Sequence, residues 1–181
     1  RLSLRDGRRI GEFRTGAAPH EIAVAPDGRL AVVTNYGAAE SGNSLSVLDL
    51  RGGKPTRSID LGQHSAPHGL RFLPDGRRVL VTTEGSASLL VVDVASGEIV
   101  RVIEVGGGTG HMMAVSPDGR VAYLTKIQAG TLSRIDLQSG MKAISLPACT
   151  ASPQRANSSS TATRSPSSTG TPALPLLIHS V

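Results

Sequence analysis

The amino-acid sequence predicts an all-β fold made of repeated four-stranded antiparallel units, and two observations carry this prediction. A compound motif occurs three times: a histidine, an alternating apolar run, Pro-Asp-Gly, and a second apolar run. The three copies recur at a period of roughly 40–50 residues, a spacing typical of β-propellers and solenoids. Each copy has room for four short strands, the content of one propeller blade. The copies occupy His20 to Gly37, His68 to Gly85 and His111 to Gly130.

The middle copy shows the expected elements in order. Its first strand covers residues 68–73 and ends at Pro74-Asp75-Gly76, where proline presets φ and glycine accepts the tight turn. A β-branched run follows at 78–82, then a turn, and then a third strand at 89–93. Residues 98–105 alternate with period two, which indicates a half-buried fourth strand.

The same template divides the rest of the chain into blades. The first residues read as the last half of a preceding blade, with strands at Leu2 to Leu4 and Arg9 to Arg14. The third copy loses the repeat pattern after Asp136, so we expect about two and a half to three blades. The expected boundaries are a half blade at 1–15, blades at 16–62, 63–106 and 107–144, and a tail at 145–181.

The tail differs from the blades in composition. From Ser145 onward there is no acidic residue and no Pro-Asp-Gly, and Ser, Thr, Pro and Ala dominate. Such a composition is typical of a disordered low-complexity segment. The alternative is a frameshift in a gene rich in G and C, in which case the blades are a fragment of a larger propeller.

Composition limits the classes of protein to consider. With 39% hydrophobic residues but two Phe, two Tyr and no Trp, the core must consist of Val, Ile, Leu and Ala. The single cysteine, Cys149, rules out an intrachain disulfide framework and a thiolate metal cluster. No apolar run approaches the ~20 residues that span a bilayer, and no signal peptide is visible.

The compound motif resembles the YVTN family of β-propeller repeats. The resemblance rests on APHEIAVAPDG with Val33-Thr34-Asn35, and on APHGLRFLPDG with the following VLVTTEG. The third copy departs from it at Gly110 and at Leu124-Thr125-Lys126. The resemblance implies a WD40-like propeller of about seven blades in a periplasmic, secreted or cell-surface protein. Relatives of this kind include YncE-like periplasmic proteins, surface-layer antigens and propeller lactonases.

The repeated histidines His20, His68 and His111 are the best site candidates. Each stands six residues before the proline of its Pro-Asp-Gly, at the start of the expected innermost strand. In a propeller these positions surround the mouth of the central channel, so three imidazoles could hold a metal ion there. They could instead bind an anionic ligand when protonated. A third interpretation is structural: each histidine bonds a loop of its own blade.

Other polar motifs are better explained as structure. Asp27, Asp75 and Asp118 are expected to cap their own turns, and Asp49, Asp93 and Asp136 to end the third strands. Glu21 and Glu84 are not repeated, and His64 falls in a loop between blades, so none of these is assigned to a site. Gly106 to Gly110 lacks the Lys-Ser/Thr of a phosphate-binding loop and reads as a connection between blades.

Three functional hypotheses follow. The first is a non-enzymatic propeller scaffold that binds an unidentified protein or small ligand at the three histidines, without a cofactor or catalytic residues. The second is a lactonase-like hydrolase with a metal at the channel mouth. The third is a YncE-like DNA-binding protein, which the net charge of +5 favours and the scarcity of aromatic stacking residues disfavours. A genuine short array would also be expected to self-assemble or to need a partner.

Overall fold

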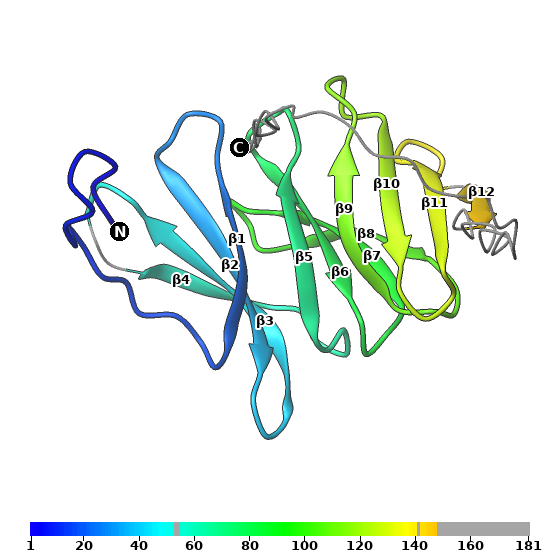
Figure 1. Ribbon diagram of the computed structural model, residues 1–181, viewed down its shortest axis with the longest axis horizontal. Coiled ribbons are helices and arrows are strands. Elements are labelled where there is room, and N and C mark those ends of the chain that lie inside the picture. The colour runs from blue at the N-terminus through cyan, green and yellow to red at the C-terminus, as the bar shows by residue number, and fades with distance from the viewer. Residues whose placement is uncertain (53–54, 141, 148–181) are drawn as a thin grey trace, which may run out of the picture. The chain divides into compact units, whose positions relative to one another are not determined.

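The computed structural model describes residues 1–52, 55–140 and 142–147. Within these residues the chain forms three separate four-stranded antiparallel sheets and no helix (Figure 1). The prediction of an all-β fold built from four-stranded antiparallel blades is therefore confirmed. The sheets contain, in chain order, β1 (Pro19–Val24), β2 (Leu30–Gly37), β3 (Ser41–Asp49) and β4 (Pro55–Asp60); β5 (Pro67–Phe72), β6 (Arg78–Thr83), β7 (Ser88–Asp93) and β8 (Ile99–Glu104); and β9 (Gly110–Val115), β10 (Val121–Lys126), β11 (Thr131–Asp136) and β12 (Lys142–Pro147).

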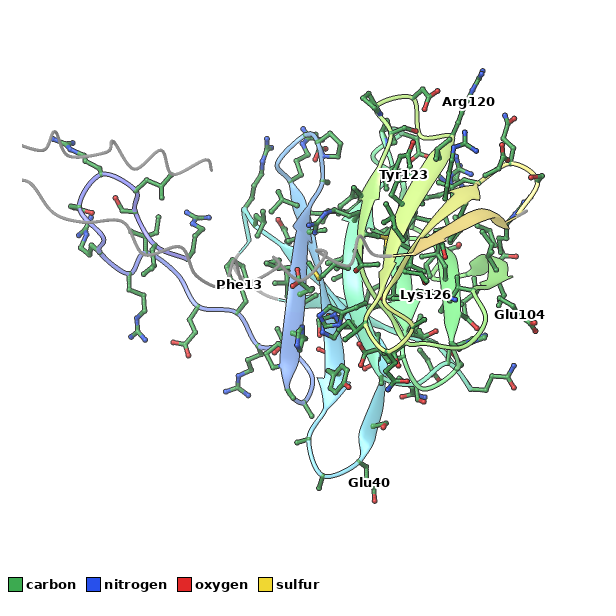
Figure 2. All side chains as sticks on the ribbon, turned by 45° about the vertical axis from the view of Figure 1, so that its right-hand side comes forward. Phe13, Glu40, Glu104, Arg120, Tyr123 and Lys126 are labelled. Carbon is green, nitrogen blue, oxygen red and sulfur yellow. The ribbon has the colours of Figure 1, made fainter. Side chains whose placement is uncertain are left out.

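Each blade is a meander in which every strand pairs with the next one along the chain. The first hairpin of each blade closes at Pro-Asp-Gly, where the glycine takes a left-handed conformation. Gly28, Gly76 and Gly119 have φ of 67°, 65° and 70°. A side chain would strain these turns, which explains why glycine recurs there. The hairpin formed by β2 and β3 is longer than the corresponding hairpins of the other two blades, because these strands have 8 and 9 residues instead of 6. Glu40 lies at its tip (Figure 2).

The blades pack on one another through the two faces of the middle sheet. Strand β7 is buried at all six positions, and its neighbouring leucines point to opposite sides. Leu90 joins an apolar cluster with the first blade, and Leu89 joins a second cluster with the third blade. Burial on both faces is the reason that β6 and β7 read as continuous apolar runs rather than as alternating ones.

The first strands of the three blades are neighbours in space: β1 lies against β5, and β5 lies against β9 (Figure 1). Residues at equivalent positions of these strands can therefore meet. This arrangement brings the candidate site residues together.

The N-terminal segment is less regular than the sequence predicts. The strands expected at Leu2 to Leu4 and Arg9 to Arg14 reduce to a single antiparallel bridge between Leu2 and Arg9. An isolated two-stranded ribbon has little apolar surface to bury, and Leu4 is fully exposed here. Phe13 does pack on the outward face of the first blade (Figure 2).

The third blade is more complete than the sequence predicts. Although the repeat motif ends near Asp136, β12 pairs with β11 and extends past the expected end of the blade at residue 144. Backbone hydrogen bonds build this strand, so it does not need the sequence motif. The predicted tail lies outside the described residues from position 148 on. No helix in the described part is long and apolar enough to cross a membrane.

Candidate functional site

The three repeated histidines form one column of imidazoles that contact one another at tilted angles. His20 lies near the start of β1, His68 near the start of β5 and His111 near the start of β9. The ring centroid of His68 is 3.9 Å from that of His20 and 3.9 Å from that of His111. Residues 48 and 43 positions apart in the chain therefore make direct contact. We call these three side chains the imidazole column.

Threonine hydroxyls fix the backbone of successive histidines. The Thr34 hydroxyl accepts a hydrogen bond from the amide of Glu21 at 2.9 Å, and donates to the carbonyl of His68 at 3.1 Å. In the next blade, the Thr82 hydroxyl accepts from the Gly69 amide at 2.7 Å. It donates to the His111 carbonyl at 2.9 Å. Each of these threonines thus ties its own first strand to the histidine of the following blade.

A strained residue precedes each histidine by two positions. Ala18, Ala66 and Thr109 have φ of 45°, 53° and 45°, a region that residues other than glycine rarely adopt. Their carbonyls accept the amides of Tyr36, Glu84 and Ile127, at the ends of the second strands. Consequently the side chains of Tyr36, Glu84 and Ile127, which occupy equivalent positions of the repeat, lie beside the imidazole column. Backbone strain of this kind is concentrated at functional sites.

Glu84 connects the column to a tyrosine. Nδ1 of His111 donates to Oε1 of Glu84 at 2.9 Å, and the Tyr36 hydroxyl donates to Oε2 at 2.8 Å. Burial alone would raise the pKa of Glu84, but the bonds from His111 and Tyr36 outweigh it and hold this pKa below its ordinary value. The same bond to Glu84 raises the pKa of Tyr36, with a smaller contribution from burial. The carboxylate is therefore charged and oriented.

His68, at the centre of the column, is 4% exposed, and its Nδ1 is buried without a hydrogen-bond partner. Burial lowers the pKa of His68, and the nearby His111 and His20 lower it further. The ring is therefore neutral near neutral pH. Buried polar atoms are almost always bonded in folded proteins, so an unpaired one calls for an explanation.

A cavity of about 350 Å³ opens beside the column. Apart from Glu84 and the three histidines, its wall contains Tyr36, Thr109, Ile127 and Gln128. One ring nitrogen from each of His68 and His111 and one carboxylate oxygen of Glu84 lie within 4.8 Å of one another. This group of donors could hold a metal ion.

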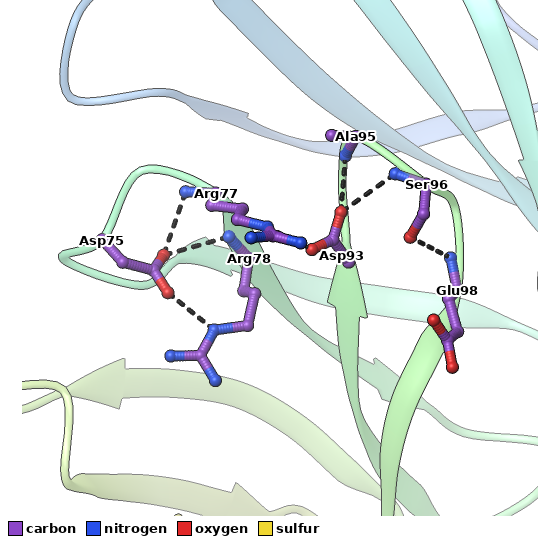
Figure 3. A network of polar contacts seen from close by, with 7 residues as sticks. All are labelled: Asp75, Arg77, Arg78, Asp93, Ala95, Ser96 and Glu98. Carbon is purple, nitrogen blue, oxygen red and sulfur yellow. Dashed lines mark hydrogen bonds and ion pairs between the residues drawn. The ribbon is translucent and has the colours of Figure 1, made fainter.

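The aspartates behave as the sequence predicts for structural residues. Oδ1 of Asp75 accepts the backbone amides of Arg77 and Arg78 in its own turn, at 2.9 and 3.0 Å. Asp93, at the end of β7, accepts the amides of Ala95 and Ser96, and pairs with Arg77 (Figure 3). Neither carboxylate approaches the imidazole column.

His64 is also outside the column. Its Nδ1 lies 3.1 Å from the Ser86 hydroxyl. His64 lies between β4 and β5, in the connection between the first two blades, as the sequence predicts.

Glu84, Tyr36 and the two bridging threonines are not predicted as site residues from the sequence. A signal for the threonines exists in the sequence, since Thr34, Thr82 and Thr125 occupy the same place in the three copies. Glu84 and Tyr36 also share one place in the repeat, two residues after the threonine. Because one is a tyrosine and the other a glutamate, the sequence shows no repeated motif at this place. Their hydrogen bond becomes visible only in the folded structure.

Comparison with known proteins agrees with the blade architecture. Residues 8–158 match the model of the YNCE-like β-propeller. The chain belongs to this family. The propeller is also similar to a solved structure of hydrazine synthase from Kuenenia stuttgartiensis, with a TM-score of 0.63 and 25% sequence identity. That match covers 77% of this chain and 38% of the hydrazine synthase chain. Among curated proteins, no sequence matches this propeller.

Proposed function

We propose that this propeller is a non-enzymatic binding scaffold whose ligand site is the imidazole column together with Tyr36 and Glu84. The observation that carries the proposal is the unpartnered Nδ1 of His68, held between two further imidazoles beside a cavity. A ligand that meets these imidazoles supplies polar partners that the protein itself does not.

The stability cost of the column supports a binding role. A buried polar atom without a partner costs roughly 1–3 kcal/mol. An aliphatic side chain at position 68 would fill the space without this penalty. The structural interpretation, in which each histidine bonds a loop of its own blade, does not account for this atom at the centre of the column. It suits His64 better, because that ring contacts Ser86 in a nearby turn.

Imidazole ¹⁵N NMR spectra of the full chain test the proposal. The probes are inorganic phosphate, succinate, glucose and ZnCl₂, added separately. We expect at least one probe to shift the ring resonances of His20, His68 and His111 together, while His64 serves as the internal control. If no probe moves the column, or if His64 moves equally, the proposed site is wrong.

A lactonase-like hydrolase is the second candidate, and Glu84 is the observation that favours it. Catalytic zinc sites commonly combine histidines with a carboxylate, and Glu84 adds a carboxylate to two imidazoles. The test is hydrolysis of γ-butyrolactone by the zinc-loaded protein. The scaffold proposal expects no turnover, whereas turnover that disappears in Glu84→Gln would favour the hydrolase.

DNA binding receives less support from the charges that are described. Arg77 and Arg78 each pair with a carboxylate of their own blade, and Arg71 faces Glu21 at 4.0 Å. Such pairing reduces the positive charge available to phosphates. Fluorescence anisotropy with a short labelled duplex tests this hypothesis, since binding through phosphates must weaken steeply with added salt.

A further inference from the structure

His68, Glu84 and His111 bring together the donor types that a divalent transition-metal ion prefers. Imidazole nitrogen suits zinc, copper and nickel, and a carboxylate completes a common donor set. The donors come from three places in the fold: the start of β5, the turn after β6 and the start of β9. Blade packing therefore assembles the group, and no short sequence motif encodes it.

The spacing of the three donor atoms is close to what a metal requires. Tetrahedral zinc, with bonds of about 2.0–2.2 Å, places its ligand atoms roughly 3.4 Å apart. Nδ1 of His111 and Oε1 of Glu84 are already 2.9 Å apart, and all three donors lie within 4.8 Å of one another. The donor–donor distances therefore differ from those of a tetrahedral zinc site by no more than about 1.5 Å. A metal would replace the proton that His111 shares with Glu84.

Neighbouring residues already hold the donors in place. Tyr36 donates to Oε2 of Glu84, which leaves Oε1 directed to His111. Hydrogen bonds of this kind orient the ligands of metal sites and tune their affinity. Thr82 fixes the backbone of His111, and the buried ring of His68 has an unpartnered Nδ1. The adjoining cavity has room for water or another ligand at the remaining metal position.

We propose that His68, Glu84 and His111 bind one divalent transition-metal ion of the zinc type, with Tyr36 as the residue that positions Glu84. This inference rests on the proposed binding function and names the ligand of the same site. The ring of His20 contacts that of His68 at a tilted angle, but His20 is not one of the proposed ligands.

Isothermal titration of the metal-stripped full chain with ZnCl₂ tests this inference. We expect one equivalent of Zn²⁺ to bind. Tyr36→Phe should weaken the affinity by about tenfold, because it removes only the support of Glu84. Glu84→Gln and His111→Ala should weaken it more than Tyr36→Phe does. Substitution with Co²⁺ gives a second readout, since its visible spectrum reports nitrogen and oxygen ligation.

Matched controls separate this site from other metal-binding groups. His64→Ala and Glu98→Gln change a histidine and an exposed glutamate that lie outside the donor set, and should leave Zn²⁺ affinity unchanged. Glu84→Asp keeps the negative charge, but its side chain is shorter by one methylene group and its carboxylate cannot reach the same position. This variant should bind Zn²⁺ more weakly and still fold, which its thermal unfolding curve checks. Zn²⁺ binding that is equally tight in Glu84→Gln and His111→Ala would overturn the inference.

The outcomes also distinguish this inference from the proposed function. If phosphate, succinate or glucose shifts the column resonances while Zn²⁺ does not bind, the binding scaffold stands and the metal site is wrong. If none of the four probes acts on the column, both proposals are wrong.

Discussion

The two ends of the inner strands β1, β5 and β9 both carry a residue that repeats in every blade, yet they differ in how its polar atoms are used. At the Pro-Asp-Gly end, each aspartate is satisfied within its own turn. At the histidine end, the rings meet across blades, and Nδ1 of His68 has no protein partner. The turn bonds join Oδ1 of Asp27, Asp75 and Asp118 to the amides of Arg29, Arg77 and Arg120 at 2.9, 2.9 and 3.0 Å. Figure 3 shows the turn of Asp75.

This difference gives a rule for interpreting repeats. A repeated polar residue is structural when its hydrogen bonds close within one repeat, and a site candidate when equivalent copies face one another with bonding capacity left over. Contact between blades alone does not decide it, because the turns touch as well: a Cβ on Gly119 would lie 2.9 Å from Pro74. Those contacts involve carbon atoms of proline rings rather than polar atoms.

The largest effect is expected from Gly69→Ala at the histidine end. A Cβ there would lie 2.4 Å from the carbonyl oxygen of His111, so β5 and β9 would have to separate. We expect a loss of about 2–3 kcal/mol in the free energy of unfolding, together with loss of the column. Urea denaturation measures the first quantity, and imidazole NMR the second.

Gly107→Ala is the matched control for this substitution, because a Cβ at that position meets nothing within 4 Å. Its free energy of unfolding should stay within about 0.5 kcal/mol of the wild-type value. Equal stability of Gly69→Ala and Gly107→Ala would show that the first strands are not in close contact.

The next effect concerns the hydroxyl that links two blades. Thr82→Val leaves the buried amide of Gly69 and the His111 carbonyl without their partner, and should cost about 1–3 kcal/mol. The comparison variant is Thr125→Val, whose hydroxyl bonds only Met112 of its own blade. We expect Thr125→Val to cost less, as measured by thermal and urea unfolding. A larger loss for Thr125→Val would argue against the role of the bridge.

Asp75→Ala and His68→Leu test whether the two ends of these strands have different roles. Asp75→Ala removes two backbone bonds and the pairing with Arg78, and should lower stability by about 1 kcal/mol with Zn²⁺ binding intact. His68→Leu should abolish Zn²⁺ binding and keep or raise stability, because it removes a buried unpaired nitrogen. If Asp75→Ala abolishes Zn²⁺ binding and His68→Leu does not, the metal site does not lie at the histidine end of the strands.

The smallest effect is a dependence of stability on pH. Because burial lowers the pKa of His68 in the folded state, the unfolded chain binds a proton more readily there. Stability should therefore fall as the pH drops below the ordinary histidine value of 6.5. Urea midpoints measured in EDTA between pH 7.5 and 5.5 should decrease for the wild type and less so for His68→Leu. Parallel decreases would exclude His68 as the cause.

The sequence predicts the blades well and the residues of the candidate site only in part. Repetition reveals the fold because each blade must bury the same strand faces, and it also reveals His20, His68 and His111. It does not reveal Glu84, since the copies carry tyrosine, glutamate and isoleucine at that position. The pairing of Glu84 with a histidine of the next blade depends on how the sheets pack. Strand β12 was missed for a related reason, because backbone pairing with β11 builds it without the motif.

The imidazole ¹⁵N spectrum of the full chain during titration with Zn²⁺ tests most directly whether the repeated histidines form one site across the blades. We predict that the resonances of His68 and His111 change together and stop changing at one equivalent, while His64 does not respond. If His68 and His111 respond independently of each other, or only in parallel with His64, the repeated histidines do not form one site across the blades.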